Sequence, residues 1–143
     1  MQPNFLSPAW RERVAPLGML AALALLPLAA AAADTSAPQQ LERFSALAGT
    51  PGQSERGRAF FTSRHDNGGS CSSCHGNPPT GPGKHASTGK PIDAMAPAAN
   101  ATAFTSTAKV DKWFRRNCND VVRRECSAVE KADVLAYLLS VKP

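Results

Sequence analysis

Apolar residues recur at helical spacing in four separate stretches of the chain. In one of them, Val110, Trp113, Phe114 and Asn117 fall at positions i, i+3, i+4 and i+7, which is one face of a helix. Three of these side chains are large and apolar, and the fourth is an amide. A polar amide on a face that should be buried needs a partner, so Asn117 is a candidate functional residue. The helix is predicted over residues 107–117.

Three further helices are predicted. The first covers residues 39–48 and is broken by GTPG, and the second runs over 54–64 with Ser54 as a favourable N-cap. The last covers 127–141, where SAVE has the S-x-x-E form of a capping box. Between 67 and 100 the chain is rich in Gly, Pro, Ser and Ala, without the alternation that indicates a strand. The pattern predicts an all-α domain with long loops and no internal repeats.

The N-terminal segment has the features of a secretory signal peptide. Arg11 and Arg13 precede an apolar run over 17–30 and the small-residue stretch AAAD. The run is shorter than the roughly 20 residues that a spanning helix needs, and it contains Pro27. Cleavage is predicted after Ala33, which would make the protein periplasmic, and an uncleaved membrane anchor is the alternative.

Removal of residues 1–33 leaves one small domain, residues 34–143. The net charge falls from +5 to +4, because the leader carries two arginines and one glutamate. This mild excess favours acidic partners. The chain shows no aromatic-rich basic patch and no nucleic-acid-binding motif, so binding to nucleic acid is not expected. A core of this size, in a chain with so many loop-forming residues, often needs an additional staple.

The strongest chemical signal is CSSCH, formed by Cys71, Cys74 and His75 with the two serines between them. Two thiols at this spacing can form thioether bonds with the vinyl groups of a haem, and the adjoining histidine is the proximal iron ligand. This attachment takes place outside the cytoplasm, in agreement with the signal peptide. One such motif predicts one covalently attached haem c.

Other uses of these cysteines fit less well. A thioredoxin-like C-x-x-C needs a βαβ pattern, whereas GGS and GNPPTGPG flank this motif. A zinc site would need Cys118 and Cys126 as a second pair, but seven residues separate them instead of the usual two to four. A simple disulfide between Cys71 and Cys74 would leave His75 without a purpose.

Cys118 and Cys126 remain as a pair in an oxidising compartment, which predicts a disulfide. A loop this short contributes roughly 2–3 kcal/mol to stability by the chain-entropy estimate. The bridge would also make the turn after Asn117 more rigid. The alternative is two free, buried thiols.

Basic residues occupy the other side of the predicted 107–117 helix. At about 100° per residue, Lys112, Arg115 and Arg116 point away from the face that carries Asn117. This side is either simply solvated or a docking surface for an acidic redox partner.

Several segments resemble known proteins. Gly57, Phe61, CSSCH and the terminal KADVLAYLLSV resemble a class I cytochrome c, in which the first and last helices cross. In that fold the glycine allows close approach to an aromatic residue of the last helix, here Tyr137. The segments ERGRAFF, STGKPI, MAP, KVDKWFRRNCNDVV, REC and EKADVLAYL are similar to the Sphaeroides haem protein (SHP) family, over residues 40–138.

This resemblance implies a specific distal ligand. In the SHP family it is an asparagine in the motif R-N-C, which matches Asn117, and a family disulfide matches Cys118 and Cys126. The asparagine leaves the iron on reduction, so that ferrous haem can bind small diatomic ligands such as oxygen and nitric oxide. A neutral amide oxygen is a hard, weak donor, adequate for ferric iron and poor for ferrous iron.

Other side chains compete for the distal position. Met95, in DAMAP, would be the one methionine left after cleavage, and a loop methionine is the usual distal ligand in class I cytochromes c. His65, His85 and an open site are further alternatives. If Met95 binds, the protein is a six-coordinate electron shuttle that takes up no diatomic ligand.

The resemblance also implies electron donors, namely a dihaem cytochrome c and a membrane b-type cytochrome. An oxidase or reductase acting on oxygen or nitric oxide stays open as a third function. The sequence shows no acid–base pair for it, because His65 and His85 have no positioned partner.

Overall fold

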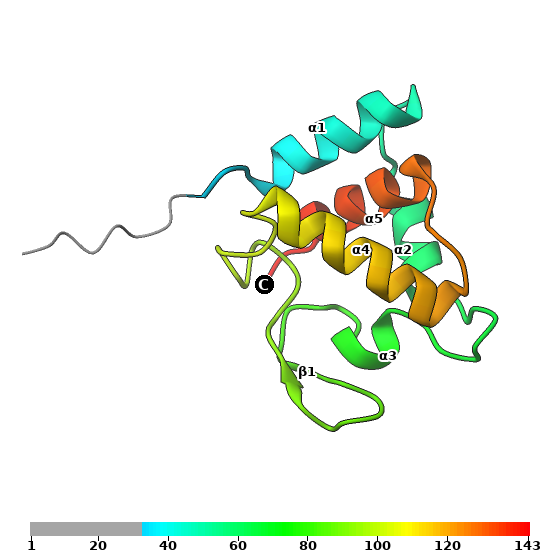
Figure 1. Cartoon of the computed structure of the whole chain (residues 1–143). Coiled ribbons are helices and arrows are strands. Elements are labelled where there is room, and N and C mark those ends of the chain that lie inside the picture. The colour runs from blue at the N-terminus through cyan, green and yellow to red at the C-terminus, as the bar shows by residue number, and fades with distance from the viewer. Residues whose placement is uncertain (1–32) are drawn as a thin grey trace, which may run out of the picture. The chain divides into compact units, whose positions relative to one another are not determined.

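The structure is a computed structural model that describes residues 33–143, so the predicted signal peptide lies, but for its last residue, outside the described residues. Within this part of the chain the fold is all-α, as predicted, with a single two-stranded ladder (Figure 1). None of the described helices combines the length and apolar character needed to cross a bilayer. The elements are α1 (Ala37–Ala48), α2 (Ser54–Thr62), α3 (Ser72–His75), β1 (Gly83–Lys84), β2 (Pro91–Ile92), α4 (Thr107–Val122) and α5 (Ala128–Ser140).

Local capping sets the ends of α1 and α5. Ser36 caps α1, which begins at Ala37, two residues before the predicted start, and Gly49 ends the helix in the left-handed region at φ 66°. The predicted capping box of α5 is present, because Ser127 accepts from the backbone of Glu130 and the Glu130 side chain accepts in return.

The start of α2 differs from the prediction. Its N-cap is Gln53, whose side chain makes no capping hydrogen bond, and Ser54 is already helical. The reason is tertiary. The backbone N–H of Gln53 donates to the carboxylate of Asp133 at 2.7 Å, and the Ser54 hydroxyl lies 2.7 Å from that of Ser140.

Helix α4 is longer than predicted. It continues past Asn117 and ends at Val122, and its C-cap Arg123 adopts a left-handed conformation at φ 61°. Val122 is buried beside Cys118, so the last turn has its own apolar contacts. Asn117 therefore lies inside a continuous helix, more than a turn before its end.

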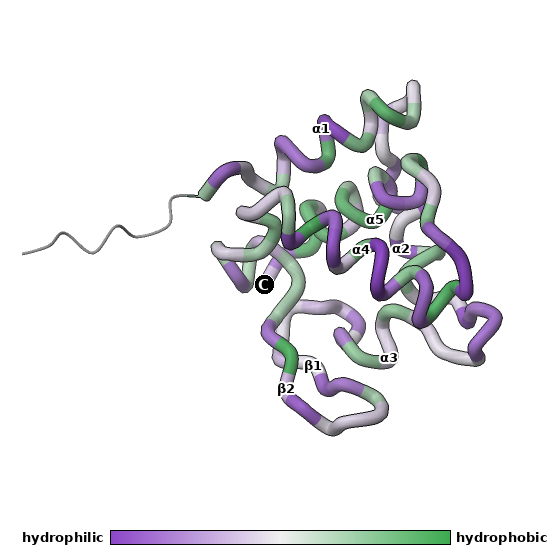
Figure 2. The backbone as a smooth tube through the Cα atoms, in the orientation of Figure 1, coloured by the Kyte–Doolittle hydropathy of each residue, from purple (hydrophilic) through white to green (hydrophobic). Residues whose placement is uncertain are grey.

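The core forms where α5 packs against α1 and α2. Leu135 packs with Phe44 of α1, and Leu138 packs with Phe61 of α2. Figure 2 shows the apolar character concentrated on the interior helix α5, whereas α4 carries many hydrophilic residues. The buried face of α5 thus joins the two helices that precede the haem motif.

The glycine at the α2–α5 contact has a different neighbour from the one predicted. A Cβ atom on Gly57 would collide with the backbone carbonyl of Asp133, so the glycine permits backbone-to-backbone approach. Tyr137 instead packs against Phe61, with ring centroids 5.5 Å apart. Asp133 and Tyr137, one turn apart on α5, therefore contact different residues of α2.

The segment predicted as one long loop contains three short elements. Helix α3 begins directly after Cys71, and the antiparallel ladder pairs Gly83 with Ile92 and Lys84 with Pro91. Elements of two to four residues leave too few positions for a periodic signal, which is why the sequence does not reveal them.

Candidate functional site

A cavity of about 1190 Å³ lies among the loops and α4. Its wall includes all three residues of the haem motif as well as Met95 and Asn117. The volume exceeds the usual range for a small organic ligand, so the cavity can take a large prosthetic group.

The haem motif gathers its three functional residues within one helical turn. Cys71 precedes α3, while Cys74 and His75 belong to it, and the His75 N–H donates to the Cys71 carbonyl at 3.1 Å. Because residues three and four apart share a helix face, this turn directs all three to the cavity. The spacing in CSSCH thus places the two thiols and the imidazole on one side of the helical turn.

Burial sets the protonation states of the haem-motif side chains. Burial raises the pKa of the Cys71 thiol to about 11, and Cys71 and Cys74 are both free. Burial lowers the pKa of His75, so its imidazole is neutral, and its Nδ1 is buried with no hydrogen-bond partner in the described chain. A neutral imidazole is the form that binds a metal.

The same wall does not suit zinc. Structural zinc is held by four protein ligands, whereas the haem-motif turn supplies three, and Cys118 and Cys126 are joined to each other in a disulfide. Within residues 33–143, no group of three or more His, Cys, Asp or Glu side chains could hold a metal ion. The donor set therefore fits two thioethers and one imidazole, as in haem c.

Some of the residues that pack against α3 and its neighbouring loop were not predicted from the sequence. A Cβ atom on Gly83 would collide with the carbonyl of Cys74, so β1 runs directly against the motif helix. On the core side, the Phe61 ring centroid lies 6.3 Å from that of His75. The Tyr137 hydroxyl donates to the Asn77 side chain at 3.3 Å. No periodic pattern marks Gly83, because its role depends on a contact between backbones.

Helix α4 supplies another wall of the cavity. The predicted face is present, and its four members Val110, Trp113, Phe114 and Asn117 all line the cavity. Val110 is buried and Phe114 packs edge-on against a core phenylalanine, but Trp113 is 47% exposed.

The basic residues of α4 were predicted to point away from the face that carries Asn117, and the structure shows this for only some of them. Arg116 borders the cavity, with its guanidinium 5.5 Å from the Trp113 ring centroid and 3.6 Å from the Asp120 carboxylate. These contacts draw the long side chain across the helix. Lys112 and Arg115 are exposed and lie outside the cavity wall.

Asn117 stands out among the asparagines. Within residues 33–143, the side chains of the other asparagines make hydrogen bonds, whereas that of Asn117 makes none to the described protein. It is half-buried and lines the cavity. A free amide in this position is available to a ligand or a metal.

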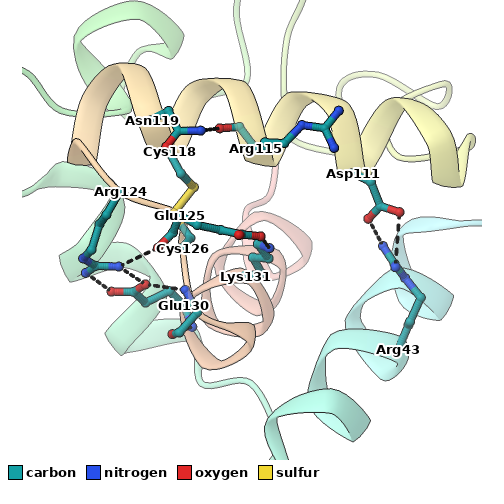
Figure 3. A network of polar contacts seen from close by, with 11 residues as sticks. Arg43, Asp111, Arg115, Cys118, Asn119, Arg124, Glu125, Cys126, Glu130 and Lys131 are labelled. Atoms are coloured by element: carbon teal, nitrogen blue, oxygen red, sulfur yellow. Dashed lines mark hydrogen bonds and ion pairs between the residues drawn. A yellow bond between two sulfur atoms is a disulfide. The ribbon is translucent and has the colours of Figure 1, made fainter.

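A disulfide joins Cys118 to Cys126, as the sequence predicts, with Cα atoms 5.6 Å apart. Figure 3 shows it connecting α4 to the segment before α5, next to the ion pair of Arg124 with Glu130. Both cysteines are buried, with Val122 between them in one cluster. The residue that follows Asn117 is thereby fixed to a second segment.

The rival ligands differ in their surroundings. Met95 also lines the cavity, and its side chain packs against the core cluster of Phe61 and Leu138. His85 lines the cavity with its Nδ1 3.3 Å from the backbone N–H of its own loop. His65 is not part of the wall, and its Nε2 lies 2.9 Å from the Phe60 carbonyl.

Comparison with known proteins identifies the family. Residues 47–138 match the domain of unknown function DUF1924. The chain is also 46% identical over 113 residues to the cytochrome c-type protein SHP of Cereibacter sphaeroides, covering 76% of this chain and 87% of that one. The chain belongs to the SHP family of c-type cytochromes. Its class I cytochrome c fold and one covalently attached haem c follow from this membership.

Solved structures of relatives share the fold of this cytochrome. One is oxidized SHP, described as an oxygen-binding cytochrome c, with 45% identity and a TM-score of 0.68. The match covers 73% of this chain and 96% of that structure. Oxidized cytochrome c″ of Methylophilus methylotrophus also gives a TM-score of 0.68, at 32% identity, covering 75% and 95% of the two chains.

Proposed function

We propose that this protein is a periplasmic electron-transfer cytochrome with Asn117 as its distal ligand. Asn117 leaves the iron on reduction, so that ferrous haem can bind a small diatomic ligand such as oxygen or nitric oxide. The observation that carries this proposal is the free, half-buried amide of Asn117 on the cavity wall.

The proximal residues hold the group. Cys71 and Cys74 form the two thioether bonds, and His75 binds the iron through its neutral imidazole. When bound, the haem would supply a redox-active iron, and Asn117 and Met95 are among the side chains of the cavity wall that could donate to it beside His75. The available side-chain donors determine which of them binds the iron in each oxidation state.

An amide suits a position that must be filled in one oxidation state and free in the other. Its oxygen is a hard, uncharged donor, which prefers ferric to ferrous iron. Two relatives support this proposal. SHP is described as oxygen-binding, and a solution structure of cytochrome c″ concerns the structural basis of haem-ligand detachment.

The alternative is an electron shuttle with Met95 as a permanent distal ligand. It is favoured by the position of Met95 on the same cavity wall. A thioether is a soft donor that holds ferrous iron well, so this protein would take up no diatomic ligand.

Absorption spectra of both oxidation states, with and without carbon monoxide, separate the two functions. We expect a six-coordinate ferric form and a five-coordinate, high-spin ferrous form that binds carbon monoxide quickly. Asn117→Ala should change the ferric spectrum and leave the ferrous spectrum nearly unchanged. Met95→Leu is the matched control, because it keeps the volume and removes only the thioether. A low-spin ferrous haem that loses its ligand only in Met95→Leu would establish the shuttle instead.

The electron donors proposed for this protein are a dihaem cytochrome c and a membrane b-type cytochrome. Support comes from the family resemblance and from the exposed basic residues Lys112 and Arg115, which suit an acidic partner. The periplasmic location rests on the predicted signal peptide and on the extracytoplasmic attachment of haem c.

A further inference from the structure

The side chain of Asn67 connects two walls of the cavity. Its Nδ2 donates to the backbone carbonyl of Asp120 in α4 at 2.6 Å, and its Oδ1 accepts from the Gly69 N–H at 2.7 Å. Asn67 lies four residues before Cys71, and Asp120 lies three residues after Asn117. The Asn67 side chain therefore joins two segments. One is the loop that leads into the haem motif, and the other is the turn of α4 that follows Asn117, the candidate distal ligand.

The Asp120 backbone carbonyl is one that the helix itself leaves without a hydrogen-bond partner. Asp120 is among the last residues of a helix that ends at Val122, and the last four carbonyls of a helix have no intrahelical partner. The Asn67 amide fills this role from a distant segment. It thus caps the C-terminal end of α4 from the side of the haem motif.

The turn that carries Asn67 is itself held in place. The His65 N–H donates to the Gly69 carbonyl at 2.8 Å, and the Gly68 N–H donates to the His65 carbonyl at 2.7 Å. Gly68 adopts φ 79°, a conformation that favours glycine. The His65 side chain lies 2.9 Å from the Phe60 carbonyl at the end of α2. A fixed turn makes the tie from Asn67 to α4 a constraint on α4.

We propose that Asn67 is a positioning residue that sets the distance of Asn117 from the proximal wall. This inference rests on the proposed role of Asn117 and deepens it. The Asn67 tie at Asp120 and the disulfide at Cys118 both hold the part of α4 that directly follows Asn117, so that the amide of Asn117 reaches the iron in the ferric state. Loss of the tie lets the end of α4 move away and weakens the bond made by Asn117.

The chain offers a matched pair of variants. Asn67→Asp keeps the acceptor for the Gly69 N–H but replaces the donor with a carboxylate facing the Asp120 carbonyl. Asn119→Asp makes the same chemical change on α4 itself, where the amide donates to the carbonyl of Arg115 in the same helix at 2.8 Å. Both asparagines are exposed, so neither substitution disturbs the core.

The assay is titration of the ferric protein with imidazole, which must displace the distal ligand to bind. The free energy of a hydrogen bond predicts that Asn67→Asp binds imidazole about two to ten times more tightly than the wild type. Asn119→Asp should stay within about twofold of the wild type. Equal affinities for the two variants would overturn the positioning role.

Asn117→Ala separates this inference from the proposed function. If Asn117 is the ligand, Asn117→Ala alone tightens imidazole binding, and adding Asn67→Asp to it has no further effect. If Asn117→Ala leaves imidazole binding unchanged, the proposed function fails. If it tightens binding while Asn67→Asp does not, the proposed function stands and the role of Asn67 falls. An additive double variant would also contradict positioning through Asn117.

Discussion

Removing the disulfide beside the candidate ligand should destabilise the domain and disturb the ferric site together. The perturbation is the double substitution of Cys118 and Cys126 by alanine. Alanine is preferred to serine because both positions are buried, and a buried serine hydroxyl without a partner would itself destabilise the fold. The bridge spans a sequence separation of 8 and joins α4 to the segment before α5. Its loss therefore frees the end of α4 that follows Asn117.

The magnitude follows from the length of the closed loop. The chain-entropy estimate for a separation of 8 is about 2.5 kcal/mol at 25 °C. A small domain has a total stability of roughly 5–15 kcal/mol, so this is a substantial share of it. The midpoint of thermal unfolding should fall by about 10–20 °C.

The assay is urea unfolding of the ferric protein, followed by far-UV circular dichroism and by the haem spectrum. The variant should show a lower free energy of unfolding, and its native ferric spectrum should report a weaker distal ligand. The control is the alanine substitution of Glu42, an exposed residue of α1 outside the cavity wall. An unfolding free energy equal to that of the wild type would refute the loop-closure reasoning. A destabilised variant with an unchanged ferric spectrum would show that the bridge stabilises the fold without holding Asn117.

Three further predictions concern the described part of the chain. Asp34→Ala removes the carboxylate that accepts from the first backbone N–H of α4 at 2.8 Å, and should lower the free energy of unfolding in urea by about 1 kcal/mol. The Arg124 guanidinium lowers the pKa of Glu130, so the ionised carboxylate stabilises the fold at neutral pH. Glu130→Gln should then be destabilised at pH 7, and its difference from the wild type should shrink as the pH falls below about 4.5 through the folded-state pKa. Lys112→Glu with Arg115→Glu should slow reduction by an acidic donor at low salt and have little effect at about 1 M salt, in stopped-flow measurements. Rates that are equal at every ionic strength would leave this side of α4 without a docking role.

Periodicity and capping motifs predicted the long helices because their causes are local. The S-x-x-E motif at Ser127 became a capping box, and the face shared by Val110 and Asn117 became a cavity wall. The start of α2 was misplaced because the deciding contact, from the Gln53 N–H to Asp133, joins residues eighty positions apart. A local pattern cannot report a contact of that kind.

The residues that the sequence did not reveal share this property. Gly83 acts through a missing side chain next to Cys74, and Asn67 acts through a carbonyl on α4. Asp34 caps α4 from outside the helix, where Ser106 makes no side-chain capping bond. Each of them is an ordinary loop residue in sequence, and each acquires its role only when a distant backbone group lies beside it.

The same reasoning explains why a weak donor needs so much support. A soft thioether such as that of Met95 can order its own loop, because a strong bond to iron offsets the entropy lost. An amide bond contributes less, so the conformation of Asn117 must be restricted before it binds. A continuous helix, a disulfide at the next residue and a side-chain tie one turn later provide such restriction. In the proposed function, the reduced iron then has only a weak bond to break, and the helix returns the amide to the same place when the iron is oxidised again.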